Sequence, residues 1–501
     1  MKPRQPVLDR RKFLGSSALA SGALLFGPGR AEAQGAPPVL RIETRTIEVN
    51  KKAAKVFHVA GPGGRNGILA TEGDRFNGTV VNASHEPLQL HWHGQVKAPF
   101  DQDRARPGGG SLPIGGSDTF DFELTPGTHW MHSHTLSEQL LLAAPMIARE
   151  KNAGDVQDVV VMLHDFSFRS PEEILAGLGG AGVHSSHDAA PSKGAPVASE
   201  GSRSGSGAGS RTGSRSAATG APKGSAAHGH RPGMVHANDV TYDAYLANER
   251  TFDDPEVVRV AKGARVRLRI INGATATAFF ITTPGMKSAC IAVDGNACAP
   301  ISAASYPLAQ GQRVDLVVTI PNSGGAFPVI AGVEGVRFQT GIILATVGAS
   351  ITRRSTSALA ARPLIDTAFE ALVRASAPLT ARAADKAFNL TLGEGDNYRW
   401  TINNRIHGEH EPLKVGRGER VEISFANPTG MMHPMHLHGH HFQVVAIGGR
   451  RFAGAMRDTV IVPPNLPVTI ALDAEHKGQW FLHCHHLYHM ATGMMTELHV
   501  A

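Results

Sequence analysis

The chain has 501 residues, of which 42% are hydrophobic and 18% charged, with 56 glycines and 31 prolines. At roughly 150 residues per domain this length predicts two to four domains, and the turn-rich composition favours β architecture over helical bundles. Six of the 49 basic and two of the 43 acidic residues lie in residues 1–33. The rest of the chain therefore has a formal charge of about +2, which gives no electrostatic support for nucleic-acid binding.

Residues 1–33 have the pattern of an export signal. Arg10 and Arg11 precede a short apolar run at 13–26, and Ala31-Glu32-Ala33 matches an A-x-A cleavage site. Together these features are typical of the twin-arginine route. A membrane anchor is disfavoured because the run is too short to span a bilayer as a helix. We expect a periplasmic or secreted protein with no membrane attachment after the signal is removed.

The first predicted domain covers residues 38–165 and is rich in β-strand signals. Apolar and β-branched runs at 39–49 and 78–93 are separated by turn residues. Two His-x-His pairs lie in this block, His91-Trp92-His93 and His132-Ser133-His134.

Residues 184–232 differ from the rest of the chain, because Ser, Gly, Ala, Arg and His dominate them. Such a composition cannot bury enough apolar surface to offset the entropy of ordering, so we expect a flexible loop. The loop and its border contain five histidines: His184, His187, His228, His230 and His236. A solvated linker is favoured over weak copper capture as their interpretation.

The second predicted domain covers residues 235–350, with strand signals at 257–271 and 313–320. Cys290 and Cys298 flank Asp294-Gly295, a hairpin-turn signal. In an exported chain these two thiols could form a disulfide across that hairpin, or remain free. Residues 351–384 have the composition of a connector, in which residues 364–376, after Pro363, are expected to be partly helical.

The third predicted domain covers residues 385–501, with a strand signal at 420–425. It contains two more pairs, His436-Leu437-His438 and His483-Cys484-His485. On a β-strand, residues i and i+2 point to the same face, so each pair can present two imidazoles to one space. Imidazole is a good copper ligand, and eight of them are too many for one ion. The four pairs therefore predict a cluster of two or three copper ions.

Cys484 lies between two of these histidines, so on a strand it faces the opposite way and would bind a separate ion. A blue-copper site needs two His, one Cys and a weak axial ligand such as Met. His433, His489 and Met494 lie at suitable offsets to complete that set. A single His-x-His pair is usually a surface feature, and a lone cysteine is usually core packing. The combination of four pairs with this site makes those readings implausible.

These motifs resemble the multicopper oxidase family, which includes laccases, bacterial cuprous oxidases and ferroxidases. The matching segments are H-W-H-G at 91–94, W-M-H-S-H at 130–134, H-P-M-H-L-H-G-H at 433–440 and H-C-H-H-L-Y-H-M-A-T-G-M at 483–494. The resemblance covers essentially the whole mature chain, since the segment from Tyr242 onward also looks like the family's second domain. It implies an all-β protein of three cupredoxin-like Greek-key β-barrel domains, with a trinuclear copper cluster between the first and third.

The resemblance also implies the role of each ligand. The type 1 copper would take His433, Cys484, His489 and axial Met494, and the type 2 copper would take His91 and His436. The pair of type 3 ions would take His93, His132, His134, His438, His483 and His485. This gives four coppers, with Cys484 and its flanking His483 and His485 as the electron path to dioxygen.

The family places an acidic residue after the first motif to help deliver protons. Asp101 or Asp103 could match, and Asp101 is preferred because Pro99-Phe100-Asp101 fits the local pattern with a one-residue gap. A surface carboxylate is the alternative interpretation. Cuprous oxidases carry Glu just after the third histidine of the last motif, where this chain has Met490. A thioether cannot relay protons, so Met490 cannot take the place of that Glu in a proton route.

Two enzyme readings remain for the reductant, a phenolic compound and a metal ion. Six methionines crowd the type 1 ligands in sequence, and thioethers suit Cu(I): Met431, Met432, Met435, Met490, Met494 and Met495. Methionines that fill core space are the alternative. We expect a laccase-like, monomeric oxidase that also takes Cu(I). A dedicated cuprous oxidase is the runner-up, while a non-catalytic copper-binding protein and a copper nitrite reductase are disfavoured by the intact ligand set.

Overall fold

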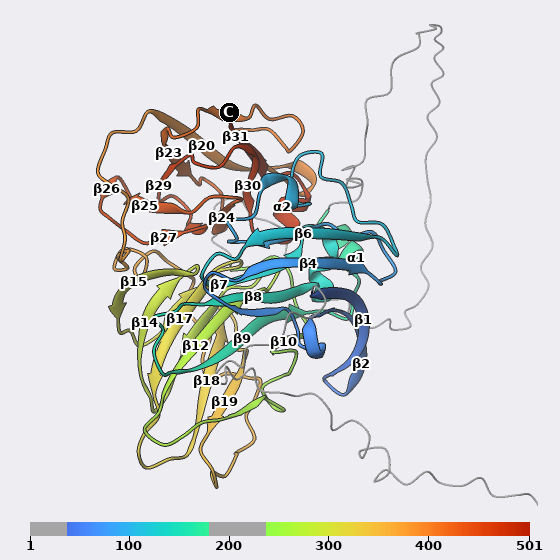
Figure 1. Cartoon of the computed structure of the whole chain (residues 1–501), viewed down its shortest axis with the longest axis vertical. Coiled ribbons are helices and arrows are strands. Elements are labelled where there is room, and N and C mark those ends of the chain that lie inside the picture. Colours follow the sequence, from blue (N-terminus) through green and yellow to red (C-terminus); the bar gives the residue numbers. More distant parts are fainter. Residues whose placement is uncertain (1–37, 180–236) are drawn as a thin grey trace, which may run out of the picture.

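The computed structural model describes residues 38–179 and 237–501. The expected export signal at 1–33 and the Ser/Gly/His-rich loop at 184–232 lie outside these residues. The described part is nearly all β and forms three two-sheet domains that follow one another along the chain (Figure 1). This confirms the predicted all-β class. No helix in the two described ranges is long and apolar enough to cross a membrane.

The first domain packs two four-stranded sheets around a core that includes Phe76, Trp92 and Met131. One sheet has the order β2-β1-β4-β6, with β1 (Val39–Val49), β2 (Lys52–Ala60), β4 (Arg75–Asn82) and β6 (Ser117–Glu123). The other has the order β3-β8-β7-β5, with β3 (Ile68–Thr71), β5 (Leu90–His93), β7 (Gly127–Ser133) and β8 (Ala143–Arg149). The predicted strand run at 78–93 is thus two strands in different sheets.

The second domain has a six-stranded sheet and a five-stranded sheet. The larger has the order β10-β9-β12-β17-β14-β15: β9 (Gln157–Phe166), β10 (Ala244–Ala247), β12 (Arg265–Asn272), β14 (Lys287–Val293), β15 (Asn296–Ile301) and β17 (Arg313–Thr319). The smaller has the order β11-β19-β18-β13-β16: β11 (Val257–Arg259), β13 (Phe279–Thr282), β16 (Tyr306–Leu308), β18 (Ala326–Val333) and β19 (Gln339–Ala345).

Strand β9 corrects the predicted domain boundary at 165. It pairs in parallel with β12 from Gln157 to Leu163, so it belongs to the second domain rather than the first. Nine of its ten residues are buried, as is usual for a strand covered on both faces. A short helix, α1 (Pro171–Gly177), follows it and starts with a capping box at Ser170.

The predicted hairpin at Asp294-Gly295 is present. Both turn residues have positive φ, 47° and 75°, as a tight two-residue turn requires, and they join β14 to β15. Cys290 and Cys298 are both buried and free, with their Sγ atoms 3.8 Å apart.

The connector at 351–384 contains no helix, so the expectation of helix at 364–376 is wrong. Turn bonds run from Ala371 N–H to Thr367 O (2.8 Å) and from Val373 N–H to Phe369 O (3.3 Å). Phe369 and Val373 then pack into the core of the second domain. Burying these two anchors holds the chain in an irregular path instead of allowing a continuous helix.

The third domain also has two sheets. One has the order β21-β20-β23-β29-β25-β26, with β27 on β25: β20 (Lys386–Gly395), β21 (Arg399–Ile402), β23 (Arg420–Ala426), β25 (Phe442–Ile447), β26 (Arg450–Arg451), β27 (Met456–Arg457) and β29 (Val468–Asp473). The other has the order β22-β31-β30-β24-β28: β22 (Leu413–Val415), β24 (His433–Leu437), β28 (Thr459–Val462), β30 (Gly478–Cys484) and β31 (Met495–Val500).

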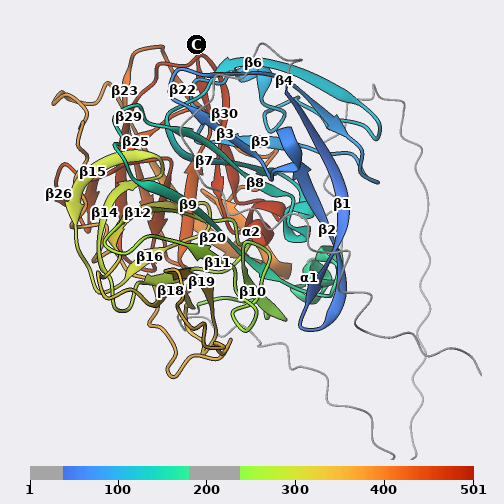
Figure 2. The ribbon, with the colours of Figure 1, turned by 60° about the horizontal axis from the view of Figure 1, so that its bottom comes forward.

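The first and third domains lie next to each other, although the second domain separates them in the sequence. In Figure 2 the blue first domain and the red third domain meet near β5, β7 and β30, with the yellow-green second domain beside them. The first and third domains therefore share an interface. The helix α2 (Leu487–Ala491) follows β30 in the third domain.

Candidate metal centre

Strand register brings the His-x-His pairs together two by two. In the first domain β5 and β7 pair antiparallel with His91 opposite His132. In the third domain β24 and β30 pair antiparallel with His436 opposite His483. Since residues i and i+2 share a face, each of these two strand pairs presents its four imidazoles on one side of its sheet. All eight imidazoles are at most 3% exposed: His91, His93, His132, His134, His436, His438, His483 and His485.

The eight imidazoles form three groups across the domain interface. His91 and His436 oppose each other, with their Nε2 atoms 3.2 Å apart. A second group contains His93, His132 and His485, and a third contains His134, His438 and His483. In the third group Nε2 of His483 lies 3.2 Å from Nε2 of His134 and 3.0 Å from Nε2 of His438. Each group draws from both the first and the third domain.

Each ring has one nitrogen that faces the other imidazoles and one that faces away. The hydrogen bonds of the second nitrogen show whether the first carries a lone pair. Nδ1 of His436 lies 2.8 Å from Asp458 O, and Nδ1 of His438 lies 3.1 Å from Ala105 O. A backbone carbonyl only accepts, so these Nδ1 atoms carry the proton and the inward Nε2 atoms do not. His93 is reversed, with Nε2 3.0 Å from Asp458 Oδ1 and Nδ1 facing His132 and His485.

Burial keeps five of these rings neutral. Desolvation is the largest cause that lowers the pKa of His93, His436, His438 and His485 well below the ordinary histidine value, and neighbouring histidines lower it further. The pKa of His483 falls to about 3 for the same first reason. Nitrogen lone pairs that face one another at 3.0 Å, as between Nε2 of His438 and Nε2 of His483, repel unless a cation lies between them. The donor set therefore fits copper.

A separate group lies on the other face of β30. Sγ of Cys484 is 3.6 Å from Nδ1 of His433 and 3.7 Å from Nδ1 of His489. Cys484 N–H donates to Met494 O (3.0 Å), and both side chains lie in the core of the third domain. Thr429 Oγ1 lies 2.8 Å from Nε2 of His433, which leaves Nδ1 of that ring facing the thiol. This is the predicted two-His, one-Cys arrangement. Burial raises the pKa of the Cys484 thiol, and a coordinated cation would favour the thiolate.

The structure places Asp103, rather than Asp101, beside the cluster. Asp103 is buried, and its Oδ2 is 2.7 Å from Nδ1 of His91. Asp101 is exposed in the 3-10 turn η2 (Phe100–Gln102). The preference for Asp101 is corrected because the turn carries its carboxylate to the surface.

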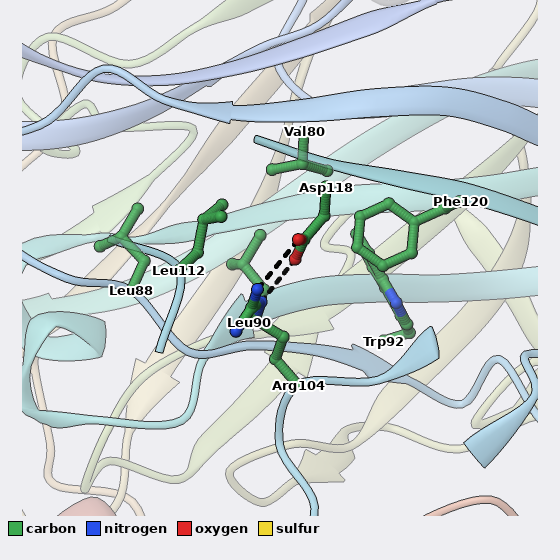
Figure 3. A pocket seen from close by; sticks show the side chains of 8 residues that line it. All are labelled: Val80, Leu88, Leu90, Trp92, Arg104, Leu112, Asp118 and Phe120. Atoms are coloured by element: carbon green, nitrogen blue, oxygen red, sulfur yellow. Dashed lines mark hydrogen bonds and ion pairs between the residues drawn. The ribbon is translucent and has the colours of Figure 1, made fainter. Parts of the chain in front are cut away.

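The next residue, Arg104, fixes the position of Asp103. Its Nη2 donates to Asp118 Oδ1 (2.9 Å) on β6, beside a small apolar void lined in part by Trp92 and Phe120 (Figure 3). The guanidinium thereby ties the loop that carries Asp103 to the outer sheet of the first domain. Trp92, whose side chain packs in this core, separates His91 from His93 and directs both imidazoles to the opposite face of β5.

Sequence reasoning missed a set of buried polar partners. Asp458 holds His93 and accepts from Arg313 Nη1 (2.6 Å) of the second domain. Burial opposes its ionisation, but Arg313 outweighs this and holds the pKa of Asp458 below its usual value. Glu138, also buried, lies 3.2 Å from Nδ1 of His132. None of these residues belongs to a short motif, so only the folded chain reveals them.

Polar and aromatic side chains surround the ring of His489 on the sides that do not face Cys484. Its Nε2 lies 3.6 Å from Asp239 Oδ2, and its ring stacks on Trp400 at 3.9 Å between centroids. His486 stacks on its other side at 3.8 Å and lies 3.2 Å from Asp239 Oδ1. Tyr398 donates a hydrogen bond to Asp239. Burial opposes ionisation of Asp239, but His486 and His489 outweigh it and hold its pKa well below the usual range.

Comparison with known proteins agrees with this geometry. Three family models, each described as multicopper oxidase, match residues 41–152, 217–350 and 380–501. The chain is 29% identical over 439 residues to the multicopper oxidase MmcO of Mycobacterium tuberculosis, covering 86% of this chain and 80% of that protein. It is 24% identical to copper resistance protein A of Escherichia coli, covering 86% of each.

Similar folds occur among solved structures. The laccase from Botrytis aclada superposes with a TM-score of 0.70 at 20% identity, covering 92% of this chain and 86% of that one. Fet3p, described as a multicopper oxidase that functions in iron import, superposes with a TM-score of 0.69 at 14% identity, covering 92% and 90%.

Proposed function

This chain belongs to the multicopper oxidase family, and from that premise we propose that it is a laccase-like oxidase that couples one-electron oxidation of a phenolic or metal-ion reductant to reduction of dioxygen to water. When bound, copper supplies the one-electron chemistry that protein side chains lack. The observation that carries the proposal is the convergence of eight buried imidazoles from two domains, with Cys484 attached between two of them.

We propose that four copper ions are held by the chain. His433, Cys484 and His489, with Met494 as axial ligand, would hold the type 1 ion. His91 and His436 would hold the type 2 ion. The type 3 ions would be held by His93, His132 and His485, and by His134, His438 and His483. The protein contributes rigidity, because outer hydrogen bonds fix the rings of His91, His93, His436 and His438 before any metal arrives.

The covalent path between the two centres is short. Cys484 faces the core of the third domain, while its neighbours His483 and His485 face the interface groups. Only backbone bonds separate the thiol residue from an imidazole of each three-histidine group. This arrangement supports Cys484, His483 and His485 as the electron path.

Asp103 is the candidate for proton handling on the His91 side. It accepts from His91 Nδ1 and also from Ala105 N–H (2.9 Å). Since Met490 has no ionisable group, the other carboxylates in contact with cluster histidines are Glu138 beside His132 and Asp458 beside His93.

The surroundings of His489 bear on the reductant. Asp239 and Tyr398 give this edge a carboxylate and a hydroxyl, which can accept a phenol hydrogen bond or attract a cation. Five of the six nearby methionines are at most 8% exposed: Met431, Met435, Met490, Met494 and Met495. They do not form a surface for Cu(I) docking, which favours broad oxidation over a dedicated cuprous oxidase. Copper resistance protein A among the relatives keeps the cuprous oxidase as the second candidate.

Oxygen uptake by the copper-loaded protein tests this assignment. Cu(I), Fe(II) and dimethoxyphenol are compared side by side, with Cys484→Ser as the matched variant. We expect uptake with the phenol and with Cu(I), and in Cys484→Ser a loss of blue colour and turnover while the cluster coppers are retained. Unchanged turnover in Cys484→Ser would refute the electron path, and uptake with Cu(I) alone would favour the second candidate.

A further inference from the structure

A second group of metal-ligating side chains lies outside the copper centre, on the outer face of the third domain. His410, Glu497 and His499 are brought together there, with side chains 8%, 13% and 27% exposed. None of the three belongs to a His-x-His pair.

Two of the three side chains come from one strand. Glu497 and His499 are residues i and i+2 on β31, so they share a face, and both are half-buried while the residues on either side are buried. The third, His410, lies in the loop before β22, the strand that pairs with β31 in the register Leu413 opposite Leu498. The i, i+2 spacing on a strand, which brings the His-x-His imidazoles together, therefore also brings Glu497 and His499 together.

The carboxylate lies between the two imidazoles. Oε1 of Glu497 is 3.5 Å from Nε2 of His410, and Oε2 is 2.6 Å from Nε2 of His499. Ligand atoms bound to one transition ion at about 2.0–2.2 Å are separated by roughly 3 Å, and both contacts of Glu497 are close to that spacing. The two histidines hold the pKa of Glu497 below its usual value although burial opposes this.

We propose that His410, Glu497 and His499 form a binding site for one divalent transition ion of the Zn²⁺ or Cu²⁺ class. Two imidazoles and a carboxylate with positions left for water are a ligand set that suits these ions and not Mg²⁺. Binding would displace the proton that now lies between imidazole and carboxylate. It would also cost the weak bond from Gly408 N–H to Nδ1 of His410 (3.2 Å), on an exposed turn where water can replace it.

The position of the site gives it a structural consequence. An ion there would clamp the loop at 403–412 to β31, next to the C-terminal bond from Ala501 N–H to Val415 O (3.0 Å). The ring of His407 lies 5.2 Å from that of His410 and 5.5 Å from that of Phe481, which in turn lies 5.7 Å from the ring of His438. His407 and Phe481 thus lie between His410 and His438 of the cluster.

Zinc binding by the copper-loaded protein tests the site. Isothermal titration with ZnCl₂, and metal analysis after gel filtration, are done on the wild type, on Glu497→Gln with His499→Asn, and on His85→Asn. His85 is an exposed histidine of the first domain and serves as the matched control. We expect one zinc ion in the wild type and in the control. In the double variant the affinity should fall at least about tenfold, since even loss of an outer-shell partner costs that much.

Thermal unfolding gives a second readout. Zinc should raise the Tm of the wild type and of His85→Asn but not of the double variant, because an ion that binds only the folded state stabilises it. If the variant keeps the blue absorbance of its type 1 copper, its third domain is folded. Equal zinc affinity and equal Tm shift in all three proteins would overturn the proposal and assign any binding elsewhere. A matching titration with MgCl₂ should show no binding, and binding of Mg²⁺ with the same variant dependence would contradict the assigned ion class.

Discussion

At the scale of single residues, the histidines of the copper centre depend on hydrogen-bond acceptors. These acceptors keep the ring proton on the nitrogen that faces away from the centre. His91 is fixed by the Asp103 carboxylate at 2.7 Å, and His436 by the Asp458 carbonyl at 2.8 Å. Each bond selects the tautomer in which the inward nitrogen has its lone pair. The outer partner therefore decides whether an imidazole can act as a ligand at all.

Asp103→Asn should therefore impair the enzyme far more than Asp101→Asn. The amide can turn its NH₂ toward His91 and favour the wrong tautomer, and it cannot carry a proton. Outer partners of ligands typically contribute about 10- to 100-fold, so we expect a loss of that size in oxygen uptake at saturating phenol. Asp101→Asn, on an exposed turn, should keep wild-type uptake. Equal activities of the two variants would show that Asp103 has no such part.

Glu334 offers a test of pH dependence away from the metal centre. Burial raises its pKa to about 7, although the bond from Ile365 N–H (2.5 Å) opposes the shift. An acid whose folded pKa is raised binds its proton more tightly in the folded state. Stability is therefore greatest below the unfolded pKa of about 4.5 and falls as pH rises to about 7.

Glu334→Gln should remove this pH dependence. The amide oxygen can still accept from Ile365, and no charge is buried at high pH. Relative to the wild type, the free energy of unfolding of the variant should rise by about 2–3 kcal/mol between pH 4.5 and pH 8, from the size of the shift. Urea denaturation at both pH values measures this. A difference that stays constant with pH would show that Glu334 is not protonated on folding.

At the scale of secondary-structure elements, strand register and tight turns determine the centre. The sequence alone predicts that His-x-His pairs share a strand face, and the structure shows the pairs opposite each other in β5–β7 and β24–β30. The turn after β5 shows why H-W-H is followed by glycine. Gly94 has φ of 81°, and a Cβ atom there would lie 2.2 Å from Nδ1 of His129 and 2.6 Å from Nη2 of Arg313.

Gly94→Ala should damage the cluster selectively. Left-handed backbone costs a non-glycine residue roughly 1–2 kcal/mol, and the new methyl group would also displace the Arg313–Asp458 pair that holds His93. We expect fewer than three cluster coppers by metal analysis while the blue absorbance of the type 1 site remains. Gly64→Ala is the control, since φ is 75° there and nothing lies within 4 Å of the added Cβ. Equal copper content in the two variants would contradict this account of the turn.

Elements that depend on long-range packing were harder to predict. Strand β9 follows the first-domain motifs in sequence but pairs with β12, and no local signal distinguishes the two neighbouring sheets. The connector segment at 364–376 has helical composition, yet burial of Phe369 and Val373 in the second domain overrides that propensity. The preference for Asp101 failed for a related reason, because spacing along the chain does not show which side of a turn faces inward.

At the scale of the whole molecule, the centre exists only because three domains meet. Arg313 of the second domain is fully buried and donates to Thr128 O (3.0 Å) of the first domain and to Asp458 of the third. A buried pair of this kind is costly to break, because removal of one partner leaves an unpaired charge. Arg313, Asp458 and Asp239 have no motif of their own, so their partners could not be read from the sequence.

The central claim is that imidazoles from the first and third domains share three ions while Cys484 holds a fourth. Anomalous diffraction at the copper absorption edge from crystals of the copper-loaded protein tests it most directly. We predict one peak beside Cys484, His433 and His489, and three peaks between the β5–β7 pair and the β24–β30 pair. Copper bound at Cys484 with no peaks between the two domains would contradict the account.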